Sequence, residues 1–349
     1  MSEPRESIDS RDPRPRTVIM LQYTGIGDVI WHIPYFEAVA RKSQGGRITL
    51  MAQPSTQARV LLAHEPWIES FIDHDYRPRL SDQRRGKHGG LRGMLSMART
   101  LREGHFDRIV LFSGRTSRGL LAALSGIPRR LGYGYRFWQR IFLTDGPYIQ
   151  AHQSGSVEAY PEASAFCVAH GFCDAPIVPR FSAPQALVDA MRARLAPMPR
   201  PLYALAIGTS EARKQWGEQN FAELASALCA QGAGVVILGG PQERQLAQDI
   251  LARVPQHQRD QVHVLTDAPL LGSVAALQVV DACIGNDTGM IQIAAAAAKP
   301  TYALLGNRPV LDHDPLMVSL LAPSLADVSV AQVLKALGKS TRASTVAST

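Results

Sequence analysis

A polar turn between two apolar segments, Asn286-Asp287-Thr288-Gly289, holds residues suited to binding a charged ligand. The segment before it, Val279–Gly285, is typical of a buried strand, and the Ala-rich segment after it, Met290–Ala298, is typical of a buried helix. Asn, Asp and Thr cap helices, and a glycine lets a ligand approach the backbone. Because a helix N-terminus carries free N–H groups and partial positive charge, this turn is predicted to bind phosphate. An ordinary strand-to-helix turn is the alternative reading.

A second predicted strand-to-helix turn contains small hydroxyl residues and cations. Thr209 and Ser210 can donate to a diphosphate, and Lys214 can supply a flexible positive charge. Trp216 is expected to pack at the start of the next helix more often than to stack on a ligand. The run Gly239-Gly240-Pro241, at the end of the following strand, predicts a tight turn whose backbone could meet a base or a sugar.

Asp28 follows the first predicted strand, Arg16–Gln22, in the turn Gly25-Ile26-Gly27-Asp28. Gly-X-Gly resembles the start of a dinucleotide-binding fingerprint, but the third glycine is missing and Asp28 would repel a pyrophosphate. A carboxylate at the carboxyl end of a parallel strand is well placed to act as a general base. A helix-capping aspartate is the alternative interpretation.

Basic residues dominate the stretch Arg77–Arg118, which has eleven Arg or Lys and three acidic residues. Its glycines predict a mobile loop. Aromatic residues are nearly absent from its first half, which argues against stacking on single-stranded nucleic acid, and no nucleic-acid partner is expected. The stretch fits an anionic acceptor or an anionic membrane surface, and a solvated charged face is the alternative.

The whole chain has the composition of a globular protein of two domains. It has 349 residues, 46% of them hydrophobic, and a net charge of +7 that suggests an anionic partner. Its four cysteines lack metal or redox spacing, no metal site is expected, and no apolar run approaches the length of a membrane span. Residues 1–16 lack the apolar core of a signal peptide, so a cytoplasmic location is expected.

Strands and helices alternate along the chain, which predicts parallel, doubly wound sheets. The pattern runs through a first half and starts again after a Pro-rich segment, Pro176–Pro201, that includes a predicted helix at Gln185–Leu195. The chain is expected to begin with a disordered tail (residues 1–16), followed by a first Rossmann-like domain (17–180). A linker region (181–202), a second Rossmann-like domain (203–335) and a second disordered tail (336–349) follow.

Four motifs in this order resemble the ADP-heptose:lipopolysaccharide heptosyltransferases of glycosyltransferase family 9, over residues 16 to 335. They are Gly27-Asp28-Val29 with Pro34, Lys214-Gln215-Trp216, Asn286-Asp287-Thr288-Gly289, and Lys299-Pro300-Thr301 with Leu305-Gly306. The resemblance implies an α/β GT-B architecture, in which two Rossmann-like domains with parallel sheets face a central cleft. It also implies an acceptor-binding first domain and a second domain that binds the nucleotide-sugar.

The implied activity is metal-independent, inverting transfer of a heptose from ADP-heptose to the anionic inner core of lipopolysaccharide. Asp28 would be the catalytic base, and no cofactor is expected. The residues implied to bind the donor are Thr209, Ser210, Lys214, Gly239, Gly240, Asp287, Thr288, Gly289 and Gln292. Those implied to bind the acceptor are Gly27, Arg84, Arg85, Lys87 and Arg115. Peripheral contact with the inner face of the inner membrane is expected from the acceptor and the charge.

The sequence departs from the family pattern at two positions. Gln292 stands where the family usually has a His, and Glu211 lies close to the expected diphosphate. Both leave open a related enzyme that uses another nucleotide-sugar or a protein acceptor. A non-catalytic nucleotide-sugar-binding protein is a further alternative. A nucleotide-dependent oxidoreductase would need the third glycine and an acidic residue after the second strand, and the chain has neither.

Overall fold

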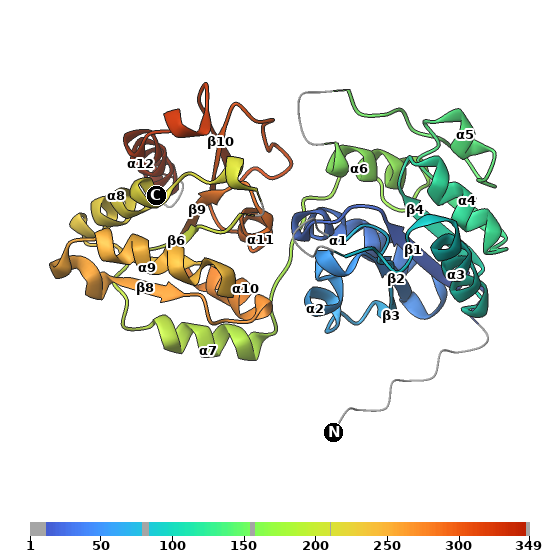
Figure 1. Ribbon diagram of the computed structural model, residues 1–349, viewed down its shortest axis with the longest axis horizontal. Coiled ribbons are helices and arrows are strands. Elements are labelled where there is room, and N and C mark those ends of the chain that lie inside the picture. The colour runs from blue at the N-terminus through green and yellow to red at the C-terminus, as the bar shows by residue number, and fades with distance from the viewer. Residues whose placement is uncertain (1–11, 79–83, 154–157, 210, 347–349) are drawn as a thin grey trace. The chain divides into compact units, whose positions relative to one another are not determined.

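The protein is described by a computed structural model that covers residues 12–78, 84–153, 158–209 and 211–346, without the side chains of residues 340–346. The chain divides into two compact units. Unit 1 contains the described residues up to Ile177, and unit 2 contains those from Val178 onward. Each unit is built on one sheet whose strand pairs are all parallel (Figure 1). This confirms the predicted α/β fold class.

The sheet of unit 1 has five strands in the order β3-β2-β1-β4-β5. The strands are β1 (Thr17–Leu21), β2 (Ile48–Ala52), β3 (Ile68–Asp73), β4 (Arg108–Phe112) and β5 (Arg129–Gly132). All residues of the three central strands are buried, because helices cover both faces of a doubly wound sheet.

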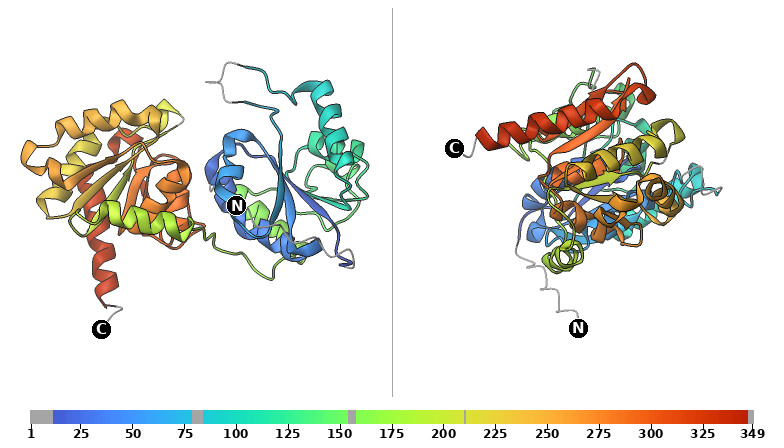
Figure 2. Two further views of the ribbon diagram at one scale, coloured as in Figure 1. Left: turned by 90° about the horizontal axis from the view of Figure 1, so that it is seen from below. Right: turned by 90° about the vertical axis from the view of Figure 1, so that its left-hand side faces the viewer.

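Two layers of helices enclose this sheet. The helices are α1 (Ile26–Arg41), α2 (Ala58–Leu62), α3 (Gly90–Glu103), α4 (Thr116–Leu124), α5 (Phe137–Arg140) and α6 (Ala159–Ala169). One face carries α1 packed against α6, and the other carries α3 and α4, with α5 against α4 (Figure 1; Figure 2). The second face buries an apolar core that includes Val18, Met97 and Leu121. The helices that follow β1 and β4 therefore leave on opposite faces.

The sheet of unit 2 has six strands in the order β11-β10-β9-β6-β7-β8. The strands are β6 (Leu202–Ala206), β7 (Gly234–Leu238), β8 (Val262–Leu265), β9 (Ala282–Asn286), β10 (Thr301–Gly306) and β11 (Met317–Leu321). The helices are α7 (Gln185–Leu195), α8 (Glu218–Ala230), α9 (Arg244–Arg253), α10 (Leu270–Val279), α11 (Gly289–Ala296) and α12 (Val330–Val346). One face packs α8, α9 and α12 over the main core, and α10 packs against α7 and α11.

Two sequence predictions in unit 1 are wrong. Helix α1 begins at Ile26, so Gly27 and Asp28, which the sequence placed in a turn, lie in its first turn. The predicted mobile loop contains α3, a helix of 14 residues. Its buried positions recur four apart at Gly93, Met97 and Leu101, which is the spacing of a helix face. Gly93 provides close packing, because a Cβ there would lie 2.2 Å from the backbone of His88.

The ends of the chain differ from simple tails where they are described. Asp12 accepts a hydrogen bond from the amide of Gly45, and Arg14 donates to the carbonyl of Arg41, while residues 1–11 lie outside the described part. Helix α12 runs to Val346, past residue 336 where the sequence predicts a tail. Its first half packs against α8 because Val330, Val333 and Leu337 are buried there.

Candidate functional site

The strand order of unit 1 reverses at β1 and β4, which is where doubly wound sheets hold ligands beyond the carboxyl ends of their strands. Gly27 and Asp28 stand in the first turn of α1, directly after β1. Arg115 is the N-cap residue of α4, after β4, and its side chain is exposed. Ser113 joins the two segments by donating to the side-chain oxygen of Gln22. Gly27, Asp28 and Arg115, all predicted from the sequence to act in unit 1, therefore lie at the same edge of the sheet.

Asp28 caps its own helix. Its Oδ2 accepts a hydrogen bond of 2.8 Å from the amide of Gly25, so the capping reading of the sequence is correct in part. Asp28 is partly exposed and lies at the positive end of the α1 dipole. The backbone oxygen of Asp28 lies 2.6 Å from Nδ1 of His32, a buried ring whose pKa is lowered to about 4 by burial. A carboxylate fixed at this edge can accept a proton from a bound hydroxyl.

A second carboxyl group, Glu162 on α6, contributes to the electrostatic environment of the segment after β1. Its side chain is 2% exposed, and burial raises its pKa to about 6. Its Oε1 accepts a hydrogen bond of 3.3 Å from the amide of His152. The negative charges of Glu162, Glu158 and Asp28 all raise the pKa of Tyr23, after the larger effect of burial. The sequence does not predict this cluster, because α6 is far from Asp28 along the chain.

Glu162 gives a pH-dependence that can be measured. Its folded pKa of about 6 lies above the ordinary value of 4.5. The contribution of the buried neutral acid to stability is therefore full below pH 4.5 and is lost as the pH rises through 6. Relative to Glu162→Gln, the native chain should lose about 1–2 kcal/mol of stability over this window, which thermal unfolding at pH 4.5 and pH 7 would detect. A difference between the two proteins that is the same at both pH values would contradict this assignment.

The basic residues predicted to bind the acceptor differ in their ion pairing. Arg84 pairs with the buried Asp75 at 2.5 Å, and this hydrogen bond lowers the pKa of Asp75. Arg85 and Lys87 are exposed. The guanidinium of Arg118, which the sequence did not single out, is buried 3.8 Å from the centre of the Tyr76 ring. Of these cations, Arg85 and Lys87 are therefore the more accessible to an anionic ligand.

Two adjoining hollows lie at the carboxyl ends of β2 and β3. The first has a polar lining: Gln53, Pro54, Ser55, Gln57, Asp75, Pro78 and Arg84. Ser55 also donates 2.8 Å to the carbonyl of Thr24, which connects this hollow with the turn before Asp28. The second is more apolar and shares Gln53, Pro54 and Gln57 with the first. Amide and hydroxyl groups of this kind suit a sugar.

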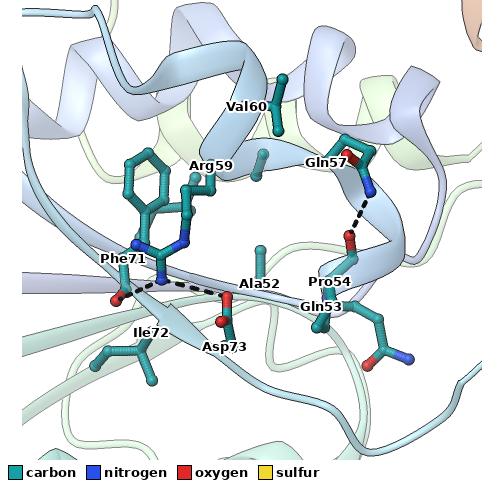
Figure 3. Close-up of a pocket in the computed structure, with 11 residues that line it drawn as sticks. Ala52, Gln53, Pro54, Gln57, Arg59, Val60, Phe71, Ile72 and Asp73 are labelled. Atoms are coloured by element: carbon teal, nitrogen blue, oxygen red, sulfur yellow. Dashed lines mark hydrogen bonds and ion pairs between the residues drawn. The ribbon is translucent and has the colours of Figure 1, made fainter. Parts of the chain in front are cut away.

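The second hollow has a volume of about 210 Å³ and is drawn in Figure 3. Arg59 lies over the ring of Phe71, with 5.2 Å between the guanidinium carbon and the ring centre. Its Nη2 is 3.4 Å from both the carbonyl oxygen of Phe71 and Oδ1 of Asp73 (Figure 3). The hollow therefore combines an Arg–Asp ion pair with apolar side chains such as those of Val60 and Ile72.

The strand order of unit 2 reverses at β6 and β9, and the predicted donor residues other than Gly239 and Gly240 lie after these two strands. Thr288 is the N-cap residue of α11, and Gly289 is the first residue of that helix. The Oγ1 of Thr288 is buried, and no hydrogen-bond partner for it exists in the part of the chain that the structure describes. A buried hydroxyl beside a helix N-terminus is suited to donate to an anion.

A cluster of charges surrounds this helix start. Asp287 pairs with Arg308 at 2.5 Å and lies 3.8 Å from Nζ of Lys214. Lys214 also pairs at 2.9 Å with Glu211, and that hydrogen bond lowers the pKa of Glu211. One nitrogen of Arg308, Nη1, is buried without a hydrogen-bond partner among the described residues. The two carboxylates thus hold two cations next to the free hydroxyl of Thr288.

Asn286 has a structural role in this arrangement and does not cap the helix. It is buried, accepts a 3.1 Å hydrogen bond from the amide of Trp216, and donates at 2.8 Å to the carbonyl of Ile207. Trp216 is buried too, and its indole donates at 2.7 Å to Val328. This confirms that Trp216 packs at the start of a helix. The two side chains fix the segment that carries Lys214 beside β9.

The glycines after β7 form the predicted tight turn. The amide of Gly240 donates at 2.8 Å to Glu243, and a Cβ on Gly239 would lie 2.9 Å from Cβ of Glu243. The carboxyl group of Glu243 also lies beside Gly208, at the end of β6. A carboxylate at this position can accept hydrogen bonds from ribose hydroxyls.

The three remaining residues predicted to bind the donor are Thr209, Gln292 and Ser210. Thr209 Oγ1 lies 3.1 Å from the carbonyl oxygen of Glu211 and so shapes its own turn. Gln292 is buried in α11 at 3% exposure. Ser210 lies outside the described residues.

Arg308 and Glu243 are candidate site residues that the sequence reasoning missed. Glu243 carries a local signal, because it stands three residues after Gly240 as the acidic residue of a capping box does. Arg308 carries only a weak one, as a cation two residues after the end of β10. Its relation to Asp287 depends on the pairing of β9 with β10.

Comparison with known proteins agrees with the geometry. Two parallel-sheet units are the architecture of GT-B glycosyltransferases, and a glycosyl transferase family 9 structure from Veillonella parvula superposes with a TM-score of 0.72, covering 93% of this chain and 96% of that one at 19% identity. The chain belongs to glycosyltransferase family 9 (heptosyltransferase), whose model matches residues 94–335. This confirms the resemblance seen in the sequence.

Two further comparisons are with heptosyltransferases. Lipopolysaccharide heptosyltransferase 2 of Salmonella typhimurium is 29% identical over 114 residues, which are 31% of this chain and 33% of that protein. The match thus spans about a third of the curated relative. An Escherichia coli heptosyltransferase solved with ADP-2-deoxy-2-fluoro heptose superposes with a TM-score of 0.68 and 16% identity, covering 93% of this chain and 99% of that one. No helix in the described ranges is long and apolar enough to cross a bilayer.

Proposed function

We propose that this protein transfers a heptose from ADP-heptose to the inner core of lipopolysaccharide, with inversion at the anomeric carbon. The observation that carries the proposal is the group around the start of α11: a free buried Thr288 hydroxyl, Lys214 and Arg308. A related Escherichia coli heptosyltransferase has been solved with an ADP-heptose analogue.

The donor diphosphate would lie at the N-terminus of α11. Backbone N–H groups at Gly289 and the hydroxyl of Thr288 would donate to it, and the cations of Lys214 and Arg308 would exchange part of their pairing with Asp287 for the phosphates. Asp287 would orient the two cations or contact the sugar. Positive charge fixed here stabilises the charge that develops on the departing ADP, and it makes a metal ion unnecessary.

The nucleoside would extend toward the ends of β6 and β7. The glycines of the turn at Gly239 and Gly240 let Glu243 pack closely against it, and Glu243 would accept hydrogen bonds from ribose hydroxyls. Ser210 would also contact the donor.

Unit 1 would bind the acceptor and supply the base. Asp28 would accept the proton of the attacking hydroxyl while the C–O bond to the anomeric carbon forms and the bond to ADP breaks. Gly27, Arg115, Arg84, Arg85 and Lys87 would position the anionic inner core, helped by the polar hollow at β2 and β3. We propose a cytoplasmic enzyme that contacts the inner face of the inner membrane, with acceptor and donor domains at residues 17–180 and 203–335.

Calorimetric binding of ADP, ADP-heptose, UDP and NAD without added metal tests the donor assignment. Preferential binding of ADP and ADP-heptose supports it. Preference for UDP would mean that the donor is a UDP-sugar, and binding of NAD alone would overturn the proposal.

Arg308 gives a test of the diphosphate position. Arg308→Gln should weaken ADP binding about 10–100-fold, because a charged hydrogen bond of roughly 1.5–3 kcal/mol is lost, and should affect adenosine much less. Titration of both ligands measures the difference. Arg244→Gln is the matched control, since Arg244 is an exposed cation of the same unit. Equal losses for ADP and adenosine would place Arg308 away from the phosphates.

A further inference from the structure

Helix α5 and the residues near it present large apolar side chains to solvent. Phe137 and Trp138 are 67% and 66% exposed, and Ile141 is 56% exposed. Tyr148 is 37% exposed and lies under the guanidinium of Arg140, 4.9 Å from its ring centre. We call Phe137, Trp138, Ile141 and Tyr148 the α5 surface. Exposed apolar residues gathered in this way are typical of a binding surface.

The backbone beneath the α5 surface is held firmly. The side chain of Gln139 is fully buried between the exposed residues, accepts a hydrogen bond of 2.9 Å from the amide of Gly134, and donates at 2.7 Å to the carbonyl of Ser113. Arg140 donates to the carbonyl of Gly134. The ring of Phe137 packs against that of Trp138 at 5.5 Å. The exposure of the aromatic rings is therefore built into the fold of this segment.

Arginines border the α5 surface. Arg129, Arg136 and Arg140 are exposed. Within the ranges that the structure describes, the one ion pair that any of the three makes is between Arg129 and Asp145, at 3.8 Å. Tryptophan and tyrosine concentrate at the membrane–water interface, and arginines beside apolar side chains attract anionic headgroups. The composition therefore fits an anionic lipid surface.

The α5 surface also lies near the edge that carries Asp28. The hydrogen bond from Gln139 connects it to Ser113, directly after β4. In the sheet, β4 pairs with β1, and Phe112 lies opposite Leu21. Contact with a second copy of the chain through this surface would bring arginines against arginines, which is unfavourable.

We propose that the α5 surface docks on an anionic phospholipid bilayer, with Phe137, Trp138 and Ile141 in the headgroup region and Arg136 and Arg140 on the lipid phosphates. The binding itself is independent of sugar transfer. Its advantage rests on the proposed function, because docking would hold a lipid-linked acceptor close to the end of the sheet where Asp28 stands.

Sedimentation with vesicles of phosphatidylglycerol and phosphatidylcholine tests this proposal. The full chain should bind at low salt, and Phe137→Ser with Trp138→Ser should reduce binding at least tenfold. Arg136→Gln should reduce it about fivefold, as expected for one basic residue at an anionic surface. The fluorescence of Trp138, one of four tryptophans, should shift to the blue with vesicles, and Trp138→Phe should remove that shift.

Matched controls lie in unit 2. Leu187→Ser removes an exposed apolar residue of α7, and Arg244→Gln removes an exposed cation, and neither should alter vesicle binding. Thermal unfolding verifies that each variant is folded.

Absence of binding by the native chain, or equal binding by the α5 variants and the controls, would overturn the proposal. A dimer that the α5 substitutions dissociate, without vesicle binding, would identify a self-association surface and overturn it as well. ADP-heptose binding should be unchanged in every α5 variant. Failure of the membrane-docking proposal can therefore be distinguished from failure of the proposed function.

Discussion

Replacing Asp28 with asparagine should lower turnover by about 10²-fold or more and leave the thermal stability nearly unchanged. Loss of a general base has an effect of this size. Asparagine can still accept the hydrogen bond that Gly25 donates to the side chain at position 28, so the cap of α1 is preserved. Steady-state turnover with ADP-heptose and an inner-core acceptor, together with thermal unfolding, measures both effects.

Asp28→Ala separates the two roles further. Its turnover should fall by the same factor as that of Asp28→Asn. Its stability should also fall by about 1 kcal/mol, because the helix cap is removed. Donor affinity should change little in both variants, since Asp28 belongs to unit 1 and the proposed donor site to unit 2. An asparagine variant with normal turnover would show that Asp28 only caps its helix.

Lys214→Ala should weaken the binding of ADP-heptose by about 10–100-fold, the loss expected when one charged hydrogen bond to a diphosphate is removed. The side chain of Lys214 is 17% exposed and is already aimed at the cluster by Glu211 and Asp287. Calorimetric titration of the donor measures the effect directly.

Arg213 provides the matched control for Lys214. It is adjacent in sequence and also pairs with Glu211, but its side chain is 76% exposed. Arg213→Ala should therefore change the donor Kd by less than about twofold, as expected of a surface ion pair. An unaltered Kd in Lys214→Ala would remove Lys214 from the site, and equal losses in both variants would indicate a general electrostatic effect.

The fold was predictable where the signal is local. Short apolar runs such as Thr17–Leu21 and Gly234–Leu238 have one interpretation once polar turns follow them, and the strands lie there. Helix α3 was not predicted, because its glycines indicate flexibility while the role of Gly93 depends on contact with His88. The start of α1 was misplaced because Ile26 and Gly27 read as turn residues, although Asp28 caps them from within the helix.

The candidate site was predictable residue by residue but not as a network. Asp287, Thr288 and Lys214 are visible as polar residues after strands. The pairing of Asp287 with Arg308 joins segments that follow different strands, and only the register of the sheet brings them together. Glu162 shows the same limit, because its raised pKa results from the burial of its side chain in the folded unit and has no local sequence signal.

The measurement that tests the central claim most directly is transfer of heptose from ADP-heptose to a lipopolysaccharide inner core that lacks it, with chelator present and the product's anomeric configuration determined. Transfer with inversion, released ADP in equal amount and loss of activity in Asp28→Asn are the predicted results. Tight donor binding without transfer to any inner-core acceptor, or transfer only from another nucleotide-sugar, would contradict the account.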